Sequence, residues 1–362
     1  MLQKYGKQLI FAKMKAILAL DSFKGSLTSR EAVQAASEAF GPGEAIPLPL
    51  SDGGEGFTES IVESLGGTYR TIPAHDALGR PVRARYGWVH DGQTAVLETA
   101  AASGLVGLEP HELDPFRASS YGTGELIRDA FLHGAREIWI GLGGTAVMDG
   151  GAGVLRALSS VSVSVPVHAF YDVDVPLTGP GGAAAVFGPQ KGADAEGVKF
   201  LDNRLQVLAG QWKEQYGIDS SQVPGAGAAG GIGAALAVCL QATMHEGIGA
   251  VLRIMGFKKQ LAGCDLVITG EGKADRQTLA GKAAYGVLKA VRKEATDLPV
   301  VLLAGQVEDR ECLLNAGFDE VLQITPVIDD GRDYLKKETA EENLLRGVRR
   351  ILQDFPDFRN QH

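Results

Sequence analysis

Residues 15–40 read KAILALDSFKGSLTSREAVQAASEAF and hold a strand pattern, a turn and a helix pattern in succession. Residues 16–20 are a short apolar run, which predicts a buried strand. Thr28 and Glu31 have the spacing of a capping box, and apolar residues recur at helical intervals from Val33 onward. A strand that feeds a helix through a short loop is typical of an α/β sheet, whose ligand sites lie beyond the carboxyl ends of its strands.

The same alternation marks both ends of the chain and changes in the middle. A second strand is expected at 45–50, whereas residues 68–99 contain short extended runs separated by turn residues. Strand and helix patterns resume near residue 265 and end in a helix with an apolar stripe. At 362 residues the chain exceeds the roughly 250 to 300 at which a single core stops growing, so we expect two domains.

We therefore predict an α/β fold with a Rossmann-like parallel sheet and a second α/β domain inserted into it. The Rossmann-like domain is expected to be discontinuous, comprising residues 14–65 and 246–362, with the inserted domain at 66–245. Strands near residues 16, 46, 266 and 301 should share one sheet. Residues 1–13, before Met14, are interpreted as an N-terminal extension.

Charge and cysteine usage exclude several classes of partner. The net charge is −9, with 44 acidic against 35 basic residues, so no long-range field would attract nucleic acid or an anionic membrane. No apolar run reaches the roughly 18 residues of a membrane span. Cys239, Cys264 and Cys312 are far apart and odd in number, which argues against a disulfide framework or zinc site and favours a cytoplasmic protein.

Glycine accounts for 48 residues, about twice the common usage of roughly 7%. Glycine permits positive φ and close backbone approach, so consecutive amides at a strand-to-helix turn can point at a phosphate. Any single loop could be a tight turn without a ligand, but several such loops at strand ends favour anion binding. The glycine-rich segments are 51–56, 141–151, 179–182, 225–233 and 270–272.

Three of these loops carry carboxylates beside the glycines: Asp52 with Glu55, Asp149, and Glu271 followed by Asp275. Mg²⁺ takes one or two carboxylates together with phosphate oxygens, and a further carboxylate can accept the proton of an attacking hydroxyl. This combination indicates phosphoryl transfer with ATP and Mg²⁺. Asp149 and Glu271 are the expected metal ligands, and Asp52 and Asp275 the expected catalytic carboxylates. Helix capping and solvated turns are the structural alternatives.

Lysines in short glycine-containing segments are expected to supply the countercharge. Lys24 follows the first strand, Lys191 lies in a Gly-Pro-Gln-Lys-Gly turn, and Lys282 follows Gly281. We predict catalytic contacts for Lys24 and Lys191 and a nucleotide contact for Lys282. The backbone groups expected to bind the nucleotide are those of Gly143, Gly144, Thr145, Gly230 and Gly231.

Established nucleotide-binding motifs are absent or incomplete. Residues 277–283 lack both the first glycine and the hydroxyl of a P-loop. Residues 225–230 have the Rossmann glycine spacing without a preceding strand, and 141–146 lack the acidic residue expected about 20 positions later. The seven histidines show no metal spacing. These imperfect glycine patterns leave a nicotinamide-dependent oxidoreductase open as an alternative.

Taken in order, the segments resemble the glycerate kinase family of the bacterial glyoxylate and sugar-acid pathways. The resemblance implies ATP-dependent phosphorylation of D-glycerate to phosphoglycerate, a two-domain α/β fold and a site in the cleft between the domains. It covers almost all of the chain after residue 14. The matching stretches are KAILALDSFKGSLTSREA, PLSDGGEGF, ETAAASGL, YGTGELIRDA, GLGGTAVMDGGAG, GPGGAAAVFGPQKGA, GAGAAGGIGAAL and DLVITGEGKADRQTLAGKA.

The chain departs from the family pattern at two side chains and one connection. Met148 and Val175 stand where the family usually has asparagine, and the stretch between Ala157 and Tyr171 is shorter than usual. Because these changes remove polar groups from expected site loops, a non-catalytic sugar-acid binding protein stays open as a second alternative. The sequence also leaves open which glycerate hydroxyl is phosphorylated and whether the chain forms a homo-oligomer.

Overall fold

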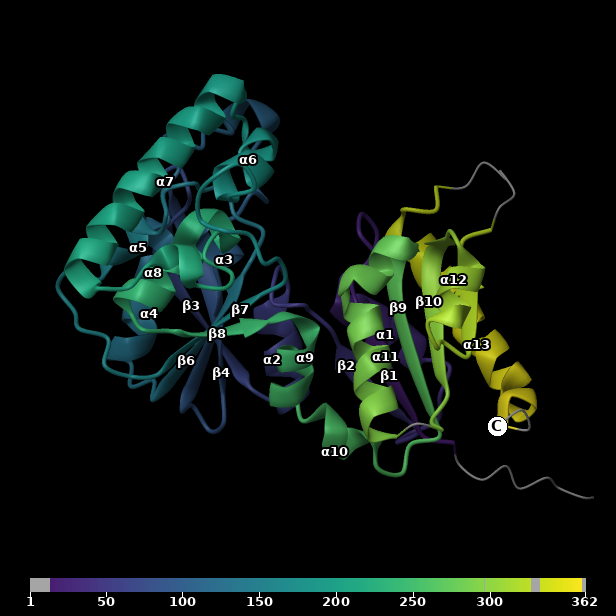
Figure 1. The fold of residues 1–362 in the computed structure, drawn as a ribbon. Helices are drawn as coiled ribbons and strands as arrows, with labels where there is room; N and C mark the ends of the chain where they lie inside the picture. The colour runs from purple at the N-terminus through teal and green to yellow at the C-terminus, as the bar shows by residue number, and fades with distance from the viewer. Residues whose placement is uncertain (1–13, 296, 327–332, 360–362) are drawn as a thin grey trace, which may run out of the picture. The chain divides into compact units, whose positions relative to one another are not determined.

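The computed structural model describes residues 14–295, 297–326 and 333–359; the predicted extension at 1–13 lies outside them. The described residues form two compact units. The first contains 14–48, 256–276 and 288–359, and the second contains 49–255 and 277–287. Both units have an α/β architecture, which confirms the predicted fold class (Figure 1).

The first unit is built on a five-stranded sheet with the strand order β11-β10-β9-β1-β2. The pairs β1–β9, β9–β10 and β10–β11 are parallel. The prediction that the strands near 16, 46, 266 and 301 share one sheet is confirmed. From β1 the chain continues to β2 on one side of β1 and later returns to β9 on its other side. The direction in which strands are added to the sheet therefore reverses between β1 and β9, as at the ligand-binding switch point of doubly wound sheets. The strands are β1 (Ala16–Leu20), β2 (Ala45–Pro49), β9 (Leu266–Ala274), β10 (Val300–Val307) and β11 (Glu320–Gln323).

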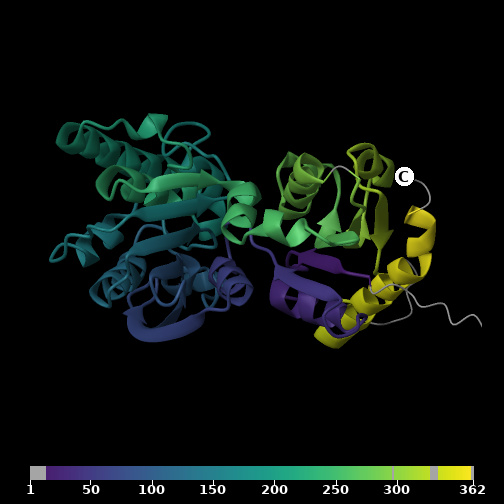
Figure 2. The ribbon, with the colours of Figure 1, turned by 90° about the horizontal axis from the view of Figure 1, so that it is seen from below.

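Helices cover both faces of this sheet. In Figure 2, α1 (Ser29–Ser37) and α13 (Lys337–Arg359) lie on one face, and α11 (Ala283–Glu294) and α12 (Arg310–Asn315) lie on the other. The predicted capping box is confirmed, because the Thr28 side chain and the N3 glutamate exchange hydrogen bonds at the start of α1. A short helix, α10 (Phe257–Leu261), belongs to the same unit.

The sequence predicts a helix over 277–293, but the helix in the structure begins later. Residues 276–280 form a 3-10 turn, η5 (Arg276–Ala280), and α11 starts only at Ala283. Gly281 between them has a φ of +114°, which an α-helix cannot accommodate. Lys282 therefore directly precedes the first turn of α11.

The second unit is built on a six-stranded sheet with the order β3-β4-β5-β6-β7-β8. The first three strands are antiparallel and correspond to the extended runs predicted within 68–99. From β5 to β8 the pairing is parallel. The strands are β3 (Thr68–His75), β4 (Pro81–Val89), β5 (Thr94–Glu98), β6 (Glu137–Leu142), β7 (Val167–Tyr171) and β8 (Thr243–Glu246).

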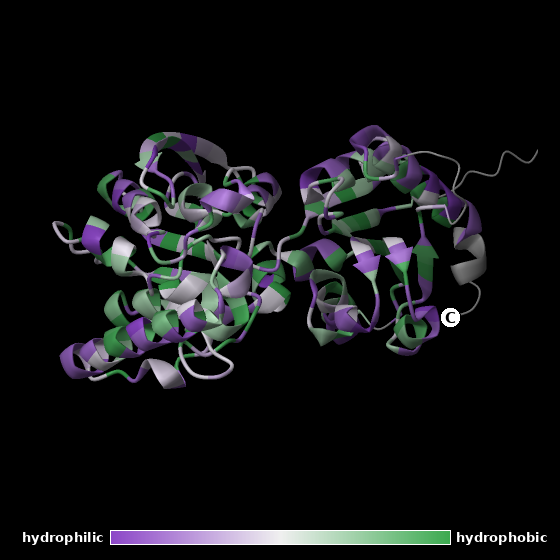
Figure 3. Ribbon diagram, turned by 90° about the horizontal axis from the view of Figure 1, so that it is seen from above, coloured by the Kyte–Doolittle hydropathy of each residue, from purple (hydrophilic) through white to green (hydrophobic). Residues whose placement is uncertain are grey.

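Helices also cover both faces of the second sheet (Figure 1). Apolar residues of α4, α5 and α8 share a core with one face, while α2 packs on β4 and β5 and α9 on β7 and β8 at the other. In Figure 3 hydrophobic residues mark the central strands of both sheets, whereas the covering helices alternate in hydropathy. The remaining elements are α2 (Phe57–Leu65), α3 (Ala100–Ser103), η1 (Pro110–Glu112), α4 (Tyr121–Leu132), α5 (Ala152–Ala157), α6 (Ala183–Phe187), η2 (Pro189–Lys191), α7 (Ala195–Tyr216), η3 (Ser220–Gln222), η4 (Ala228–Gly231), α8 (Ile232–Cys239) and α9 (Gly247–Ile254).

Two details differ from the sequence-based expectation. The units divide at residues 48/49 and 255/256, whereas the predicted domains divide at 65/66 and 245/246, because α2 packs on the second sheet. The sequence predicts a helix over 123–133 with Thr123 as its cap, but α4 starts at Tyr121 with Ser120 as its N-cap residue. The Thr123 hydroxyl instead bonds the Ser103 hydroxyl at 2.8 Å.

Among the described residues, no helix combines the length and apolar character that crossing a membrane requires. All three cysteines are described, and each is a free, half-buried thiol.

The parallel strands β5 to β8 end at one edge of the second sheet, which we call the carboxyl edge. Glu98 at the end of β5 pairs with Gly141, and Leu142 of β6 pairs with Tyr171 of β7. Tyr171 pairs in turn with Glu246 of β8. The loops that follow these strands therefore gather at this edge.

At this edge the loop 51–56 packs directly on the loop 141–144. A Cβ on Gly143 would lie 2.6 Å from the Gly54 Cα, far inside van der Waals contact. Gly53, at a φ of +109°, would bring a Cβ to 3.0 Å from the Phe170 carbonyl carbon. Glycine is required here because two backbones approach without room for side chains.

We predict that Gly143→Ala lowers the free energy of unfolding of this unit by about 1–3 kcal/mol, because both loops must shift to admit the methyl group. Urea unfolding followed by tryptophan fluorescence measures it, since Trp88, Trp139 and Trp212 all lie in the second unit. The control is Gly210→Ala on an open position of α7, where an added Cβ meets no atom within 4 Å. That variant should gain about 0.5–1 kcal/mol. Equal stability of Gly143→Ala and wild type would contradict the packing argument.

Candidate functional site at the carboxyl edge of the second sheet

Asp149 is the most heavily hydrogen-bonded of the predicted site carboxylates. Its Oδ2 accepts the Ser120 N–H and hydroxyl at 2.9 Å each and the Gly153 N–H at 3.1 Å. Its Oδ1 accepts the Gly151 N–H at 3.1 Å. The side chain is buried, at 8% exposure. Asp149 therefore ties the start of α5 to the start of α4.

Lys191 lies beneath the same loop. Its side chain is 3% exposed, and its Nζ donates to the Val147 carbonyl at 2.8 Å and the Thr145 hydroxyl at 3.3 Å. Burial lowers the pKa of the Lys191 ammonium to about 7, while the Asp149 carboxylate acts in the opposite direction. The predicted cation thus supports the loop after β6 from within the protein.

The predicted nucleotide-binding residues Gly143, Gly144 and Thr145 form the first turn after β6. The Gly143 N–H donates to the Thr99 hydroxyl at 3.2 Å, and this hydroxyl lies 3.1 Å from the Gly143 carbonyl oxygen. Gly144 is exposed, and its carbonyl accepts the Leu105 N–H at 2.8 Å. The Gly143 N–H and the Gly144 carbonyl of this turn are therefore already bonded to the protein and stabilise the turn itself.

Gly230 and Gly231 pack against the same loop. The Gly230 carbonyl accepts the Gly150 N–H at 3.0 Å, and a Cβ on Gly230 would lie 2.0 Å from the Val147 oxygen. A Cβ on Gly231 would lie 2.8 Å from the Gly150 Cα. These glycines have φ values of +66° and +91°. Close packing against Val147 and Gly150 is thus the role that the structure shows for these two glycines, and their contact with a nucleotide stays a prediction.

Asp52 stands in the loop that packs on Gly143. It is half-buried, and its Oδ1 accepts the Gly54 N–H at 3.3 Å, which stabilises a tight turn. Ser51 accepts the Gly53 N–H at 3.3 Å through its hydroxyl. The structure therefore brings Asp52, Asp149, Lys191 and the glycine loops to one edge of one sheet.

The other predicted residues lie in the first unit, at its switch point. The Asp21 N–H after β1 donates to the Gly270 carbonyl at 2.9 Å. A Cβ on Gly272 would lie 3.0 Å from the backbone nitrogen of Lys24. The exposed Lys24 loop thus runs beside the buried Glu271. Asp275 directly follows β9, with its Oδ2 3.8 Å from the Lys273 Nζ.

Lys282 is half-buried, and its carbonyl accepts the Gly286 N–H at 3.0 Å in the first turn of α11. It belongs to the second unit, whereas Lys24, Glu271 and Asp275 belong to the first. The expectation that all predicted carboxylates face one cleft concerns both units and stays a prediction.

The described residues can be tested for their fit to Mg²⁺. Asp149 is ill suited to bind it, because both of its oxygens already accept hydrogen bonds from the protein. No cluster of three or more metal-binding side chains occurs in the described part of the chain. A cation held by one or two carboxylates and by substrate phosphates does not need such a cluster. Asp52, half-buried and with one oxygen bonded to the Gly54 N–H, fits this requirement better than Asp149.

Sequence reasoning missed three polar residues at this edge: Glu98, Thr99 and Ser120. Thr99 and Ser120 act through contacts with Gly143 and Asp149, which are distant in sequence. Glu98 ends the strand β5 and precedes a small-residue segment. A carboxylate at the end of a buried strand is also the pattern that identified Asp52. Glu98 could therefore have been predicted from the sequence in the same way.

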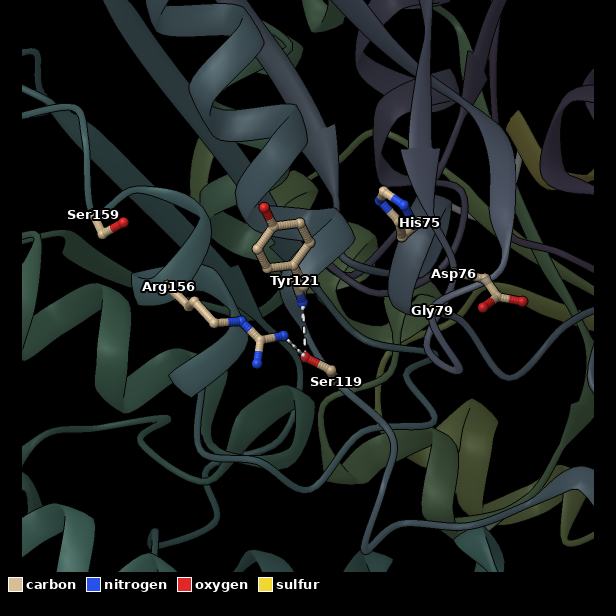
Figure 4. Close-up of a pocket in the computed structure, with 7 residues that line it drawn as sticks. All are labelled: His75, Asp76, Gly79, Ser119, Tyr121, Arg156 and Ser159. Atoms are coloured by element: carbon tan, nitrogen blue, oxygen red, sulfur yellow. Dashed lines mark hydrogen bonds between the residues drawn. The ribbon is translucent and has the colours of Figure 1, made fainter.

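The second unit also contains an open pocket of about 550 Å³, shown in Figure 4. Arg156 donates to the Ser119 hydroxyl at 3.4 Å, and its guanidinium lies 5.0 Å from the centre of the Tyr121 ring. No residue predicted from the sequence lines this pocket, and we place the candidate site at the glycine loops instead. The lining residues are His75, Asp76, Gly79, Ser119, Tyr121, Arg156 and Ser159.

The two atypical side chains do not face solvent. Met148 is fully buried in the apolar core formed with α7 and α8, and Val175 is 7% exposed. The Val175 carbonyl accepts the Gly227 N–H at 2.8 Å. Both residues therefore contribute packing and backbone contacts in the loops around the site.

Comparison with known proteins gives a consistent result. The model of the glycerate kinase family matches residues 16–164 and 160–355. The two matched segments meet at 160–164, within the connection between α5 and β7 that the sequence predicts to be short.

Relatives align over most of this chain and most of their own length. Glycerate kinase from Bacillus subtilis is 40% identical over 348 residues, covering 86% of this chain and 91% of that protein. Glycerate 2-kinase from Escherichia coli is 35% identical over 373 residues, covering 93% and 97%. A solved structure from Salmonella typhimurium LT2, assigned as a glycerate kinase 2, is 34% identical with a TM-score of 0.79, covering 95% of this chain and 98% of that one. From the family match and these alignments we conclude that the chain belongs to the glycerate kinase family.

Proposed function

We propose that this protein transfers the γ-phosphoryl group of ATP to a hydroxyl of D-glycerate, with Mg²⁺, in the cytoplasm. Membership of the glycerate kinase family supports an enzyme that phosphorylates glycerate. The observation that carries the local assignment is the gathering of Asp52, Lys191 and the Gly143 loop at one carboxyl edge. The relatives give no support to a nicotinamide-dependent oxidoreductase or a non-catalytic binder.

The proposed roles follow from the contacts of each side chain. Lys191 places a buried positive charge under the loop after β6, where it can stabilise the charge of a transferring phosphoryl group. Gly143, Gly144 and Thr145, with Gly230 and Gly231, shape the phosphate-binding surface. Asp52 binds the metal or accepts the proton of the glycerate hydroxyl.

Residues of the first unit are proposed to bind the nucleotide, ATP. Lys24, Glu271 and Asp275 lie at the switch point of a doubly wound sheet, the usual ligand position in such folds. Lys282, ahead of α11, is proposed to contact a phosphate. When bound, Mg²⁺ would neutralise charge on the phosphate oxygens, and Glu271 is its candidate carboxylate in the first unit.

A coupled ADP-release assay tests this function. ADP should form with ATP, Mg²⁺ and D-glycerate together and not when glycerate is omitted. Binding of glycerate without ADP formation would instead support the sugar-acid binder. A change in nicotinamide absorbance with glycerate would support the oxidoreductase.

The position of phosphorylation is a narrower proposal. One relative is named glycerate 2-kinase, so we propose the 2-hydroxyl as the acceptor. Phosphorus NMR of the product distinguishes 2-phosphoglycerate from 3-phosphoglycerate. The 3-phospho product would overturn this narrower proposal and leave the kinase assignment intact.

For Lys191 we predict that Lys191→Met lowers kcat on the order of 10² to 10³ fold, since the positive charge beneath the loop after β6 no longer stabilises the transition state. The kcat/KM of wild type should fall as pH rises above about 7, because the free enzyme then loses the ammonium proton. Lys191→Met should lack this alkaline limb.

Lys191 also makes stability depend on pH in a predictable direction. Its pKa in the folded chain is about 7 against an ordinary value of 10.5, so the unfolded chain binds more protons between these values. Wild-type stability should therefore rise relative to Lys191→Met as pH increases from about 7 to 10. A parallel pH dependence of the two proteins would show that Lys191 is not a buried, deprotonating amine.

For Asp52 we predict that Asp52→Asn lowers turnover and that the magnesium titration identifies its role. A proton acceptor should lose turnover while ATP and Mg²⁺ affinity stay unchanged. A metal ligand should instead need more Mg²⁺ and be partly rescued by it. The matched control is Asp219→Asn, which changes another half-buried aspartate, one paired with Lys213 at 2.7 Å and away from the glycine loops. If Asp52→Asn keeps wild-type turnover and an unchanged magnesium titration, Asp52 serves only the turn with Gly54.

A further inference from the structure

Glu98 occupies the end of β5 at the carboxyl edge, between two of the loops described above. On one side it pairs with Gly141, at the start of the loop that continues through Gly143. On the other side the backbone N–H groups of Gly56 and Thr58, at the start of α2, interact with its carboxyl group. The next residue, Thr99, holds the Gly143 backbone through its hydroxyl. Glu98 thus lies where the loop after β6 meets the loop that carries Asp52.

One oxygen of this carboxyl group has no protein partner. The Glu98 side chain is only partly exposed, and its Oε2 is shielded from solvent without a hydrogen bond. A buried polar atom without a partner in the protein is costly, and a catalytic role is one recognised reason for its presence, beside a bound water or ion.

We propose that Glu98 is a further catalytic residue, whose carboxylate accepts the proton of the glycerate hydroxyl that attacks ATP. This inference rests on the proposed kinase function and deepens it. It also assigns Asp52 to the metal, because one proton acceptor is sufficient for the reaction.

The step is balanced without any further reactant. The hydroxyl oxygen of glycerate forms a bond to the γ-phosphorus, and the bond from that phosphorus to the bridging oxygen of ATP breaks. The hydroxyl proton passes to the Glu98 carboxylate. The products are phosphoglycerate, ADP and a protonated Glu98, which releases its proton to solvent as the products leave.

The surroundings of Glu98 suit such a base. Burial raises the pKa of its carboxyl group to about 7, and the Glu55 and Glu59 carboxylates act in the same direction. The Thr58 and Gly56 N–H groups oppose this shift. A base is most effective when its pKa lies near the working pH. Since this pKa lies at about 7, part of the Glu98 carboxyl groups is ionised near neutral pH.

A structural role must be separated from this one. The Gly56 and Thr58 contacts could mean that Glu98 only caps α2, whose N-cap residue Gly56 has no side chain to do so. Glu98→Gln keeps an oxygen that accepts these N–H groups but cannot accept a proton. The two roles therefore predict opposite outcomes for turnover of this variant.

The first experiment measures ADP release, stability and ligand binding of Glu98→Gln at pH 7. We expect kcat to fall on the order of 10² to 10⁴ fold. Urea unfolding and calorimetric titration with D-glycerate and a non-hydrolysable ATP analogue should stay close to wild type. Wild-type turnover in this variant would overturn the proposal. Wild-type enzyme that releases no ADP would instead sink the kinase function itself.

The second experiment leaves Glu98 in place and changes its neighbour. Glu59→Gln removes a carboxylate that raises the Glu98 pKa, so the acidic limb of kcat/KM should move to lower pH while kcat on the plateau is unchanged. A structural cap would leave this limb where it is. An unshifted acidic limb in Glu59→Gln would overturn the proposal even if Glu98→Gln failed to fold.

Discussion

The close approach of two backbones, Gly143 on Gly54, is the constraint on which the second unit's functional edge depends. Without a Cβ on Gly143, the loop carrying Asp52 can lie directly on the loop that follows β6. Gly230 makes a similar contact with Val147 from another direction. Three segments that are distant in sequence thereby share one edge of a sheet. The glycine excess of this chain is explained first by this packing of loops. The packed loops also form the surface that we propose binds a phosphate.

Two buried ionisable side chains lie beneath the loops of this edge. Lys191 and Asp149 are both nearly inaccessible, and each is hydrogen-bonded to the backbone or hydroxyl groups of the loops they support. Such groups are preorganised, because no solvent has to rearrange around them when a phosphoryl group transfers. Lys191 and Glu98, with opposite charges when ionised, both have pKa values near 7. A glycerate kinase built this way should work best near neutral pH.

Local sequence patterns predicted what depends on local structure. The capping box of Thr28, the shared sheet of the first unit and the glycine loops at strand ends were all readable from residue order. The start of α4 was not, because Thr123 turns its hydroxyl toward Ser103 of a separate segment. Asp149 illustrates the same limit: its sequence position suggested a metal ligand, but Ser120, 29 residues away, occupies its carboxylate. Partners of this kind are decided by tertiary packing, which no local pattern encodes.

Hydrogen exchange measured by mass spectrometry, with and without D-glycerate, Mg²⁺ and a non-hydrolysable ATP analogue, tests most directly whether the glycine loops bind the substrates. Residues 51–56 and 141–151 should become protected together when all three ligands are present, because a phosphate and its metal would order both loops. Unchanged exchange in both segments, with protection confined to residues 75–79 and 156–159 around the open pocket, would contradict the placement of the site at the carboxyl edge.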